Sequence, residues 1–86
     1  SMRILYSGKF LREYKKLPKA VKIAAEEKEK IFRKNIFDKR LDSHKLHGRL
    51  KDFWSFSISH RYRIVFEFGD SDKMYFHSVG NHDVYQ

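Results

Sequence analysis

The sequence predicts an α+β domain in which an N-terminal helical hairpin packs on a small, mainly antiparallel β-sheet of about four strands. Over residues 8–34, apolar residues recur at three- and four-residue spacing, which is typical of amphipathic helices. After residue 52, three segments alternate apolar and polar residues and are joined by short turns, which is typical of antiparallel strands. Helices followed by consecutive strands indicate an α+β fold.

The N-terminal half contains one short strand and both helices. Residues 3–6 (RILY) predict a strand that adds to the sheet at its edge. Ser7 is a favourable N-cap for a helix whose apolar positions continue to Leu17, and Pro18 ends this helix or begins the next. Residues 19–34 predict a second helix with one apolar stripe and charged residues on its other faces.

The C-terminal half supplies the rest of the sheet. Residues 38–52 are polar and basic with one glycine, and we expect them to form an extended connection. Strands are then predicted over residues 53–59, 62–68 and 74–80, with GDSDK as the turn between the last two.

The alternation of these strands also predicts the character of each face of the sheet. In residues 53–59 the apolar phase faces the helices and the other phase is rich in serine. In residues 62–68 the second phase contains Arg63, and Arg61 lies one pleat earlier. We therefore expect the face away from the helices to be small, polar, basic and open.

Composition limits the class of protein. With 86 residues, of which 41% are hydrophobic, we expect a single domain over residues 1–86, and we expect Ser1, which precedes Met2, to be a remnant of cloning. There is no cysteine and no apolar run long enough for a membrane span, so we expect a cytoplasmic protein that is not inserted in a membrane. A net charge of +8 favours polyanionic partners such as nucleic acid, an anionic membrane or an acidic protein.

Histidines and basic residues are the candidates for chemistry. A basic surface that holds imidazoles can bind a phosphate and transfer protons near neutral pH. The acidic residues are scattered mostly among turns, so a two-metal nuclease site is not expected. His44 and His47 lack a third metal ligand at a clear spacing. We therefore predict no metal and no small-molecule cofactor.

Three short motifs carry a resemblance to a known family. They are H-x-L-x-G-x-x-x-x-F-W-S at residues 44–55, Y-R-I-V-F at residues 62–66, and G-N-H-D-V-Y at residues 80–85. In this order, after two basic helices, they resemble the RelE/ParE superfamily of bacterial toxins over nearly the whole chain. The similarity is greatest to the YafQ and YoeB branches, and it implies a RelE-like fold.

The resemblance also implies roles for individual residues. In the mRNA-cleaving members, an acid/base residue precedes the first central strand, an arginine lies on the next strand, and a histidine or arginine with an aromatic residue lies near the C-terminus. These positions correspond here to His44, Arg63, His82 and Tyr85. YafQ-like members have a second histidine on the strand and an acidic residue before the aromatic residue. This chain departs from that pattern, since it has Ser57 and Arg61 instead.

Each candidate also has a purely structural interpretation. Arg63 fits a solvated strand charge, His82 a turn residue, His44 a loop residue, and Tyr85 an anchor for the C-terminus. Two further residues, His77 and Trp54, are interpreted as structural and core residues. The remaining basic side chains are expected to contact RNA phosphates or to be surface charge: His47, Arg49, Lys51, His60 and Arg61.

The resemblance implies the toxin of a type II toxin–antitoxin system, a metal-independent endoribonuclease that cleaves mRNA on the ribosome and is bound by a cognate antitoxin. A base would take the proton of the ribose 2′-OH, which attacks the adjacent phosphate, and an acid would protonate the departing 5′ oxygen. His44 and His82 are the expected acid/base pair, in either assignment, and Arg63 would stabilise the phosphate charge.

Two alternatives come from other classes of protein. One is a ParE-like toxin that binds DNA gyrase and has no nuclease activity. The other is an RNA-binding module without catalysis, for which the charge of +8 would suffice. The combination of His44, Arg63, His82 and Tyr85 favours the nuclease, because a gyrase-binding protein has no evident need for it.

Overall fold

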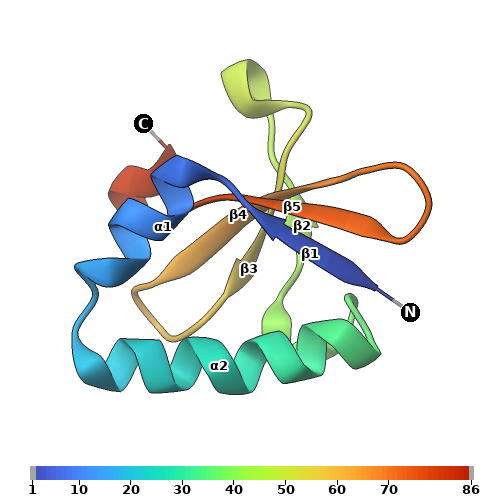
Figure 1. The fold of residues 1–86 in the computed structure, drawn as a ribbon. Helices are drawn as coiled ribbons and strands as arrows, with labels where there is room; N and C mark the ends of the chain where they lie inside the picture. The colour runs from blue at the N-terminus through green and yellow to red at the C-terminus, as the bar shows by residue number, and fades with distance from the viewer. Residues whose placement is uncertain (1, 86) are drawn as a thin grey trace.

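The computed structural model describes residues 2–85, apart from the side chain of His82. Two α-helices and a five-stranded sheet form the framework (Figure 1). In chain order the elements are β1 (Arg3–Tyr6), α1 (Gly8–Lys15), α2 (Lys19–Lys34), η1 (Lys39–Leu41), β2 (His44–Lys45), η2 (Gly48–Leu50), β3 (Trp54–Ser57), β4 (Arg63–Phe68), β5 (Lys73–Gly80) and η3 (His82–Tyr85), where η denotes a 3-10 helix.

The strands are ordered β1-β5-β4-β3-β2. Neighbours from β5 to β2 are antiparallel, whereas β1 pairs with β5 in parallel and forms one edge. This arrangement confirms the predicted α+β class and the edge position of the N-terminal strand. Sequential strands pair with one another from β2 to β5, as expected when the connections are short.

The sheet has five strands, one more than the four that the sequence located. Within the expected extended connection, His44 pairs with Ser55 and Lys45 pairs with Trp54, which makes β2 the fifth strand. The sequence did not indicate this strand because two residues are too few to establish an alternating pattern. Two 3-10 turns, η1 and η2, take up much of the remaining connection.

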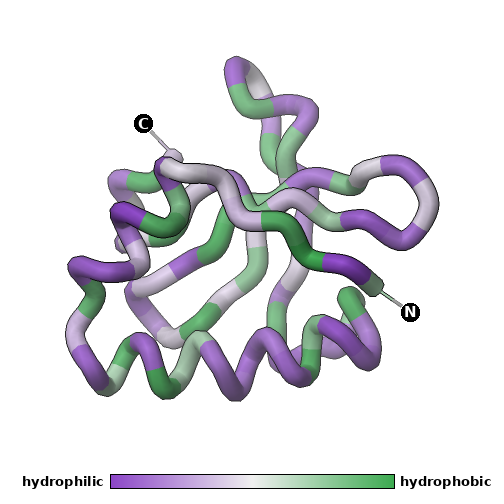
Figure 2. The backbone as a smooth tube through the Cα atoms, in the orientation of Figure 1, coloured by the Kyte–Doolittle hydropathy of each residue, from purple (hydrophilic) through white to green (hydrophobic). Residues whose placement is uncertain are grey.

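Both helices follow from local sequence. The Ser7 hydroxyl accepts a hydrogen bond from the amide of Phe10 at 2.9 Å, which caps the first turn of α1. Helix α2 begins directly after Pro18 and runs beneath the sheet in Figure 1. Hydrophilic and hydrophobic residues alternate along α2 (Figure 2), because its apolar stripe faces the sheet and its charged faces do not. Among the described residues, no helix combines the length and apolar character needed to cross a membrane.

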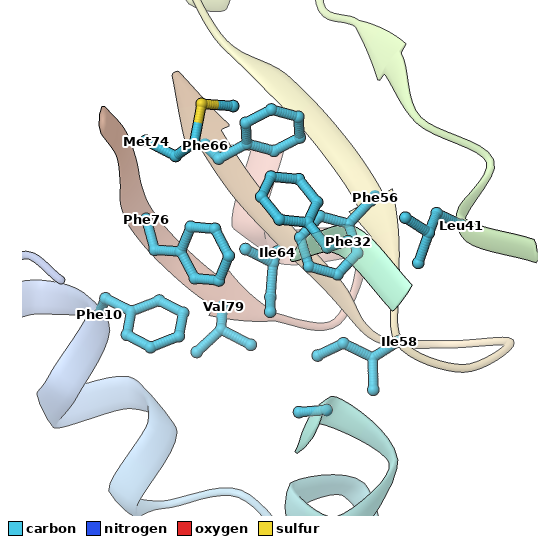
Figure 3. Close-up of a cluster of buried hydrophobic side chains, with 11 residues drawn as sticks. Phe10, Phe32, Leu41, Phe56, Ile58, Ile64, Phe66, Met74, Phe76 and Val79 are labelled. Carbon is cyan, nitrogen blue, oxygen red and sulfur yellow. The ribbon is translucent and has the colours of Figure 1, made fainter. Parts of the chain in front are cut away.

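The core lies between the helices and one face of the sheet, and it is dominated by phenylalanine (Figure 3). Phe32 of α2 has no exposed surface. Its ring centroid lies 4.8 Å from that of Phe56, 5.0 Å from that of Phe66 and 5.3 Å from that of Phe76. One helix side chain therefore contacts three adjacent strands.

The opposite face of the sheet is not open, contrary to the prediction. Val65 lies on this face with 1% of its surface exposed, and its cross-strand neighbours Ser55 and Ser78 are 0% and 1% exposed. The prediction failed because it followed the arginine and serine positions of the alternation and passed over Val65. A small polar and apolar layer thus lies beneath the C-terminal turn.

Candidate functional site

Helix η3 covers the face of the sheet that points away from α1 and α2, the second face, and brings Tyr85 to β3. The hydroxyl groups of Tyr85 and Ser55 lie 2.8 Å apart and share a hydrogen bond. A second contact holds the backbone of the same turn, since Nη2 of Arg49 donates to the carbonyl oxygen of Tyr85 at 3.3 Å. Tyr85 is therefore fixed at its hydroxyl by the sheet and at its carbonyl by η2.

His44 lies at the edge of this layer, on β2. It is directly opposite Ser55, and side chains of directly opposite residues project from the same face. The imidazole is exposed, and its Nδ1 lies 2.9 Å from the carbonyl oxygen of Asp42. A ring nitrogen that donates to a carbonyl leaves the other nitrogen as a proton acceptor. His44, Ser55 and Tyr85 thus form one row across the second face.

Arg63 lies in the next row. Its cross-strand partners are Ser57 and Gly80, and Ser57 is two residues from Ser55, a separation of about 7 Å along the strand. Arg63 was predicted to lie on an open face of the sheet, but its side chain is half-buried. Nη1 donates to the carbonyl oxygens of Ser59 at 2.8 Å, Tyr62 at 3.1 Å and His60 at 3.2 Å.

These three bonds give Arg63 a structural role. They hold the turn between β3 and β4, where the backbone carbonyls converge on one nitrogen. A guanidinium group has five N–H donors, of which Nη1 carries two, so the other three are on Nε and Nη2. The same arginine can therefore hold the turn with one nitrogen and bind an anion with the others.

A shallow hollow of about 400 Å³ lies beside the same turn and is lined by His60, Arg61, Asn81 and Asp83. It connects the β3–β4 turn with the start of η3. A more apolar hollow of about 290 Å³ lies on the helix side of the sheet, between α1 and α2. The polar hollow is the one adjacent to Arg63, so it is the one that we assign to the candidate site.

The backbone of His82 opens η3. Its side chain lies outside what the structure describes, so its predicted role stays a prediction.

No family model matches the sequence, and no curated protein matches it. Solved structures do match. YafQ from E. coli strain BL21(DE3) has a TM-score of 0.80 at 16% sequence identity, over 99% of this chain and 98% of YafQ. The YoeB/ParE toxin from Agrobacterium tumefaciens has a TM-score of 0.78 at 14% identity, over 94% of this chain and 99% of the toxin. YoeB in the YoeB–YefM complex from Staphylococcus aureus has a TM-score of 0.76 at 22% identity, over 95% and 98% of the two chains.

This chain has the fold of the YafQ and YoeB toxins. The predicted resemblance is thereby confirmed for the fold.

On the YafQ/YoeB fold, three of the predicted RNA contacts fall on one projection, the turn η2 and its caps. His47 and Lys51 flank η2, Arg49 lies within it, and all three are exposed. Gly48 begins the turn with a φ of +66°, in the left-handed region that glycine adopts without strain. This backbone requirement accounts for the glycine of the H-x-L-x-G motif.

The remaining two predicted RNA contacts, His60 and Arg61, are exposed in the β3–β4 turn. The structure thus divides the predicted site into two parts. His44 and Tyr85 lie beside Ser55, and Arg49 contacts the carbonyl oxygen of Tyr85. His60 and Arg61 lie with Arg63 at the β3–β4 turn.

Sequence reasoning missed Ser55, the buried residue that holds Tyr85. A serine flanked by aromatic residues on a strand is expected to face solvent. The partner of Ser55 becomes evident only from the placement of η3. Within residues 2–85, leaving aside the His82 side chain, no group of three or more potential metal-ligating side chains comes together.

Proposed function

We propose that this chain is the toxin of a type II toxin–antitoxin pair and a metal-independent endoribonuclease that cleaves mRNA on the ribosome. The observation that supports it best is the arrangement of three side chains in two adjacent rows of one sheet face. This face presents an imidazole from His44, a phenol from Tyr85 and a guanidinium from Arg63.

These groups suit cleavage of RNA through its own 2′-OH. His44 or His82 would take the 2′-OH proton, and the other would protonate the 5′ oxygen that departs. The 2′ oxygen attacks the phosphorus in line, the P–O5′ bond breaks, and a cyclic phosphate remains. Arg63 would stabilise the charge on the phosphate, and Tyr85 would contact the neighbouring base. DNA lacks the 2′-OH and would not be cleaved.

Basic side chains around this face would hold the RNA backbone. They are His47, Arg49, Lys51, His60 and Arg61, and they lie on the two turns that flank the rows. Because mRNA and ribosomes are the proposed partners, the protein would act in the cytoplasm without a membrane partner or small-molecule cofactor.

The matched structures suggest a protein partner as well. YafQ has been solved in the DinJ–YafQ toxin–antitoxin complex, and YoeB in a complex with YefM. We accordingly propose a cognate antitoxin that masks the basic face. Carboxylates on such a partner would complement the net charge of +8.

A second candidate function is a ParE-like toxin that binds DNA gyrase and has no nuclease activity. The observation in its favour is the set of three carbonyl contacts at Arg63, which explains this arginine without any substrate.

Cleavage of a defined mRNA on stalled ribosomes distinguishes the two functions. We expect Arg63→Ala to lower the cleavage rate about 100-fold or more, because one transition-state contact to the phosphate is lost. Arg63→Lys should recover little, since an ammonium group cannot reproduce the guanidinium geometry. Arg61→Ala, an exposed neighbour, is the matched control and should mainly weaken binding.

Thermal melts must accompany these rates. Arg63→Ala should cost about 1 kcal/mol of stability through the turn contacts, which leaves the protein folded. A folded Arg63→Ala protein that cuts mRNA at the wild-type rate would contradict the assignment. Growth arrest with intact translation and broken chromosomes would support the gyrase-binding function instead.

A further inference from the structure

A β-bulge interrupts β5 just before the C-terminal turn. Phe66 pairs with Phe76, but the preceding residue of β4, Val65, pairs with Ser78, so His77 is the extra residue. A bulge leaves backbone groups without partners in the ladder and changes which face the following residues occupy. Unbroken alternation along β5 would place His77 on one face with Tyr75 and Val79. The bulge prevents this, because Val79 is buried in the core whereas Tyr75 is exposed.

Helix α1 satisfies the backbone groups around the bulge. The Ser7 hydroxyl donates to the carbonyl oxygen of His77 at 2.7 Å. Oε1 of Glu13 accepts a hydrogen bond from the amide of Val79 at 3.0 Å. The two contacts lie on either side of Ser78, so α1 holds the bulge at both ends. Since Ser7 also caps α1, the helix and the bulge are fixed to each other.

The bulge determines where the C-terminal turn begins. Beyond it, Ser78 lies opposite Val65 on the second face, and Gly80 lies opposite Arg63. The chain then enters η3 and ends the described structure with Tyr85 on Ser55. A change of one residue in strand register would exchange the two faces for residues 78–80 and would displace η3 from the site.

We propose that Glu13 is a positioning residue for the candidate site, although it lies on α1, on the other side of the sheet. By accepting the Val79 amide it fixes the bulge, and through residues 78–80 it holds Tyr85 on Ser55. The expected effect of Glu13 on cleavage rests on the proposed nuclease function. Its expected effect on the position of Tyr85 does not, because that position can be measured without RNA.

Two substitutions separate the hydrogen bond from the rest of the side chain. Glu13→Gln keeps an oxygen that can accept from Val79, whereas Glu13→Leu has a similar size and no acceptor. We expect Glu13→Leu to lower kcat for mRNA cleavage about tenfold with little change in KM, because the RNA-contacting turns are untouched. Glu13→Gln should restore most of the rate.

Two controls exclude trivial causes. Glu27→Leu removes an exposed carboxylate from α2 and so reproduces the change of net charge. Val21→Ala, at a partly buried position of α2 packed against the core, lowers stability at a site where no hydrogen bond to the bulge forms. If Val21→Ala, compared at equal distance below its melting temperature, loses as much kcat as Glu13→Leu, general destabilisation explains the effect and the proposal is overturned.

Nuclear magnetic resonance provides the readout that does not depend on cleavage. In Glu13→Leu the Val79 amide should exchange faster with solvent, and the signals of Ser55 and Tyr85 should shift, while Glu13→Gln resembles the wild type. Unchanged Ser55 and Tyr85 signals in Glu13→Leu would overturn the positioning role. A wild-type protein that cuts no RNA would instead overturn the proposed function, and the resonance data would still decide the role of Glu13.

Discussion

At the scale of single residues, the hydrogen bond between Ser55 and Tyr85 joins the sheet to the end of the chain. Ser55 has no exposed surface, so its hydroxyl depends on Tyr85 for a partner among the described side chains. A buried hydroxyl that loses its partner keeps its desolvation cost without the compensating bond. The two side chains should therefore act as one unit.

Tyr85→Phe tests this coupling. The substitution retains the ring and removes the hydroxyl, so we expect a loss of about 1 kcal/mol in the free energy of unfolding. Ser55→Ala should cost a similar amount, and the double variant should cost clearly less than the two losses combined, because one bond is removed twice. Urea unfolding of the four proteins measures the coupling. Strict additivity would mean that the two hydroxyls do not interact in solution.

The candidate site could be predicted from sequence only in part. Arg63 was found from its place in the strand and its family motif, and the structure does place it on the second face. Its carbonyl contacts could not be foreseen, since they depend on how residues 59–62 turn back. Ser55 could not be found at all, because its partner lies 30 residues away and no local pattern links the two.

At the scale of elements, Phe32 is the central side chain in the packing of α2 on the sheet. Phe32→Ala should lower the free energy of unfolding by about 3–5 kcal/mol, since the cavity would adjoin three phenylalanine rings. Ile23→Ala, which is 54% exposed on the same helix, should cost much less. Urea unfolding monitored by circular dichroism compares them, and equal losses would contradict the central role of Phe32.

Strand β1 is tied to α2 by a titratable contact. The Tyr6 hydroxyl donates to Oε2 of Glu29 at 2.9 Å, and Arg33 pairs with the same carboxylate at 3.2 Å. Burial, followed by the hydrogen bond to Glu29, raises the pKa of Tyr6. Because the pKa of Tyr6 is higher in the folded state, the contact contributes its full share to the free energy of unfolding below the unfolded pKa, near 10. That contribution is lost as the pH rises through the folded-state pKa.

Tyr6→Phe should accordingly flatten the alkaline limb of the stability profile. Above about pH 10, the free energy of unfolding of the wild type should fall more steeply than that of Tyr6→Phe. Tyr14, whose pKa is also raised, mainly by burial, is present in both proteins, so the difference isolates Tyr6. Parallel profiles would show that the contact with Glu29 does not persist in solution.

Elements with a clear period were predictable, and those without one were not. The second helix was predicted over 19–34 and is observed over the same residues, because its apolar stripe repeats through four turns. Strand β2 and the bulge at His77 were missed. Strand β2 is too short to show an alternating pattern. The bulge is a register shift that depends on Ser7 and Glu13, more than 60 residues earlier in the chain.

At the scale of the whole molecule, the net charge of +8 would govern association with RNA, the proposed substrate. Each RNA phosphate that a basic side chain neutralises releases condensed counterions, so affinity falls as salt rises. We expect the slope of log K against log salt for a single-stranded RNA to become less steep by about 0.7 in Lys51→Gln. Fluorescence anisotropy across a salt series measures this. A salt-independent affinity would contradict the electrostatic account.

The parallel pairing of β1 with β5 determines when the protein can complete its fold during synthesis. Arg3 pairs with Lys73, and Ser7 contacts a carbonyl 70 residues later. Strand β1 therefore has no partner in the sheet until β5 has been synthesised, and such distant pairings close late. The bulge, the turn after it and Tyr85 are assembled at the same stage. A nascent chain that stops before β5 carries both helices but lacks Tyr85, so the candidate site around Ser55 cannot be completed until η3 has been synthesised.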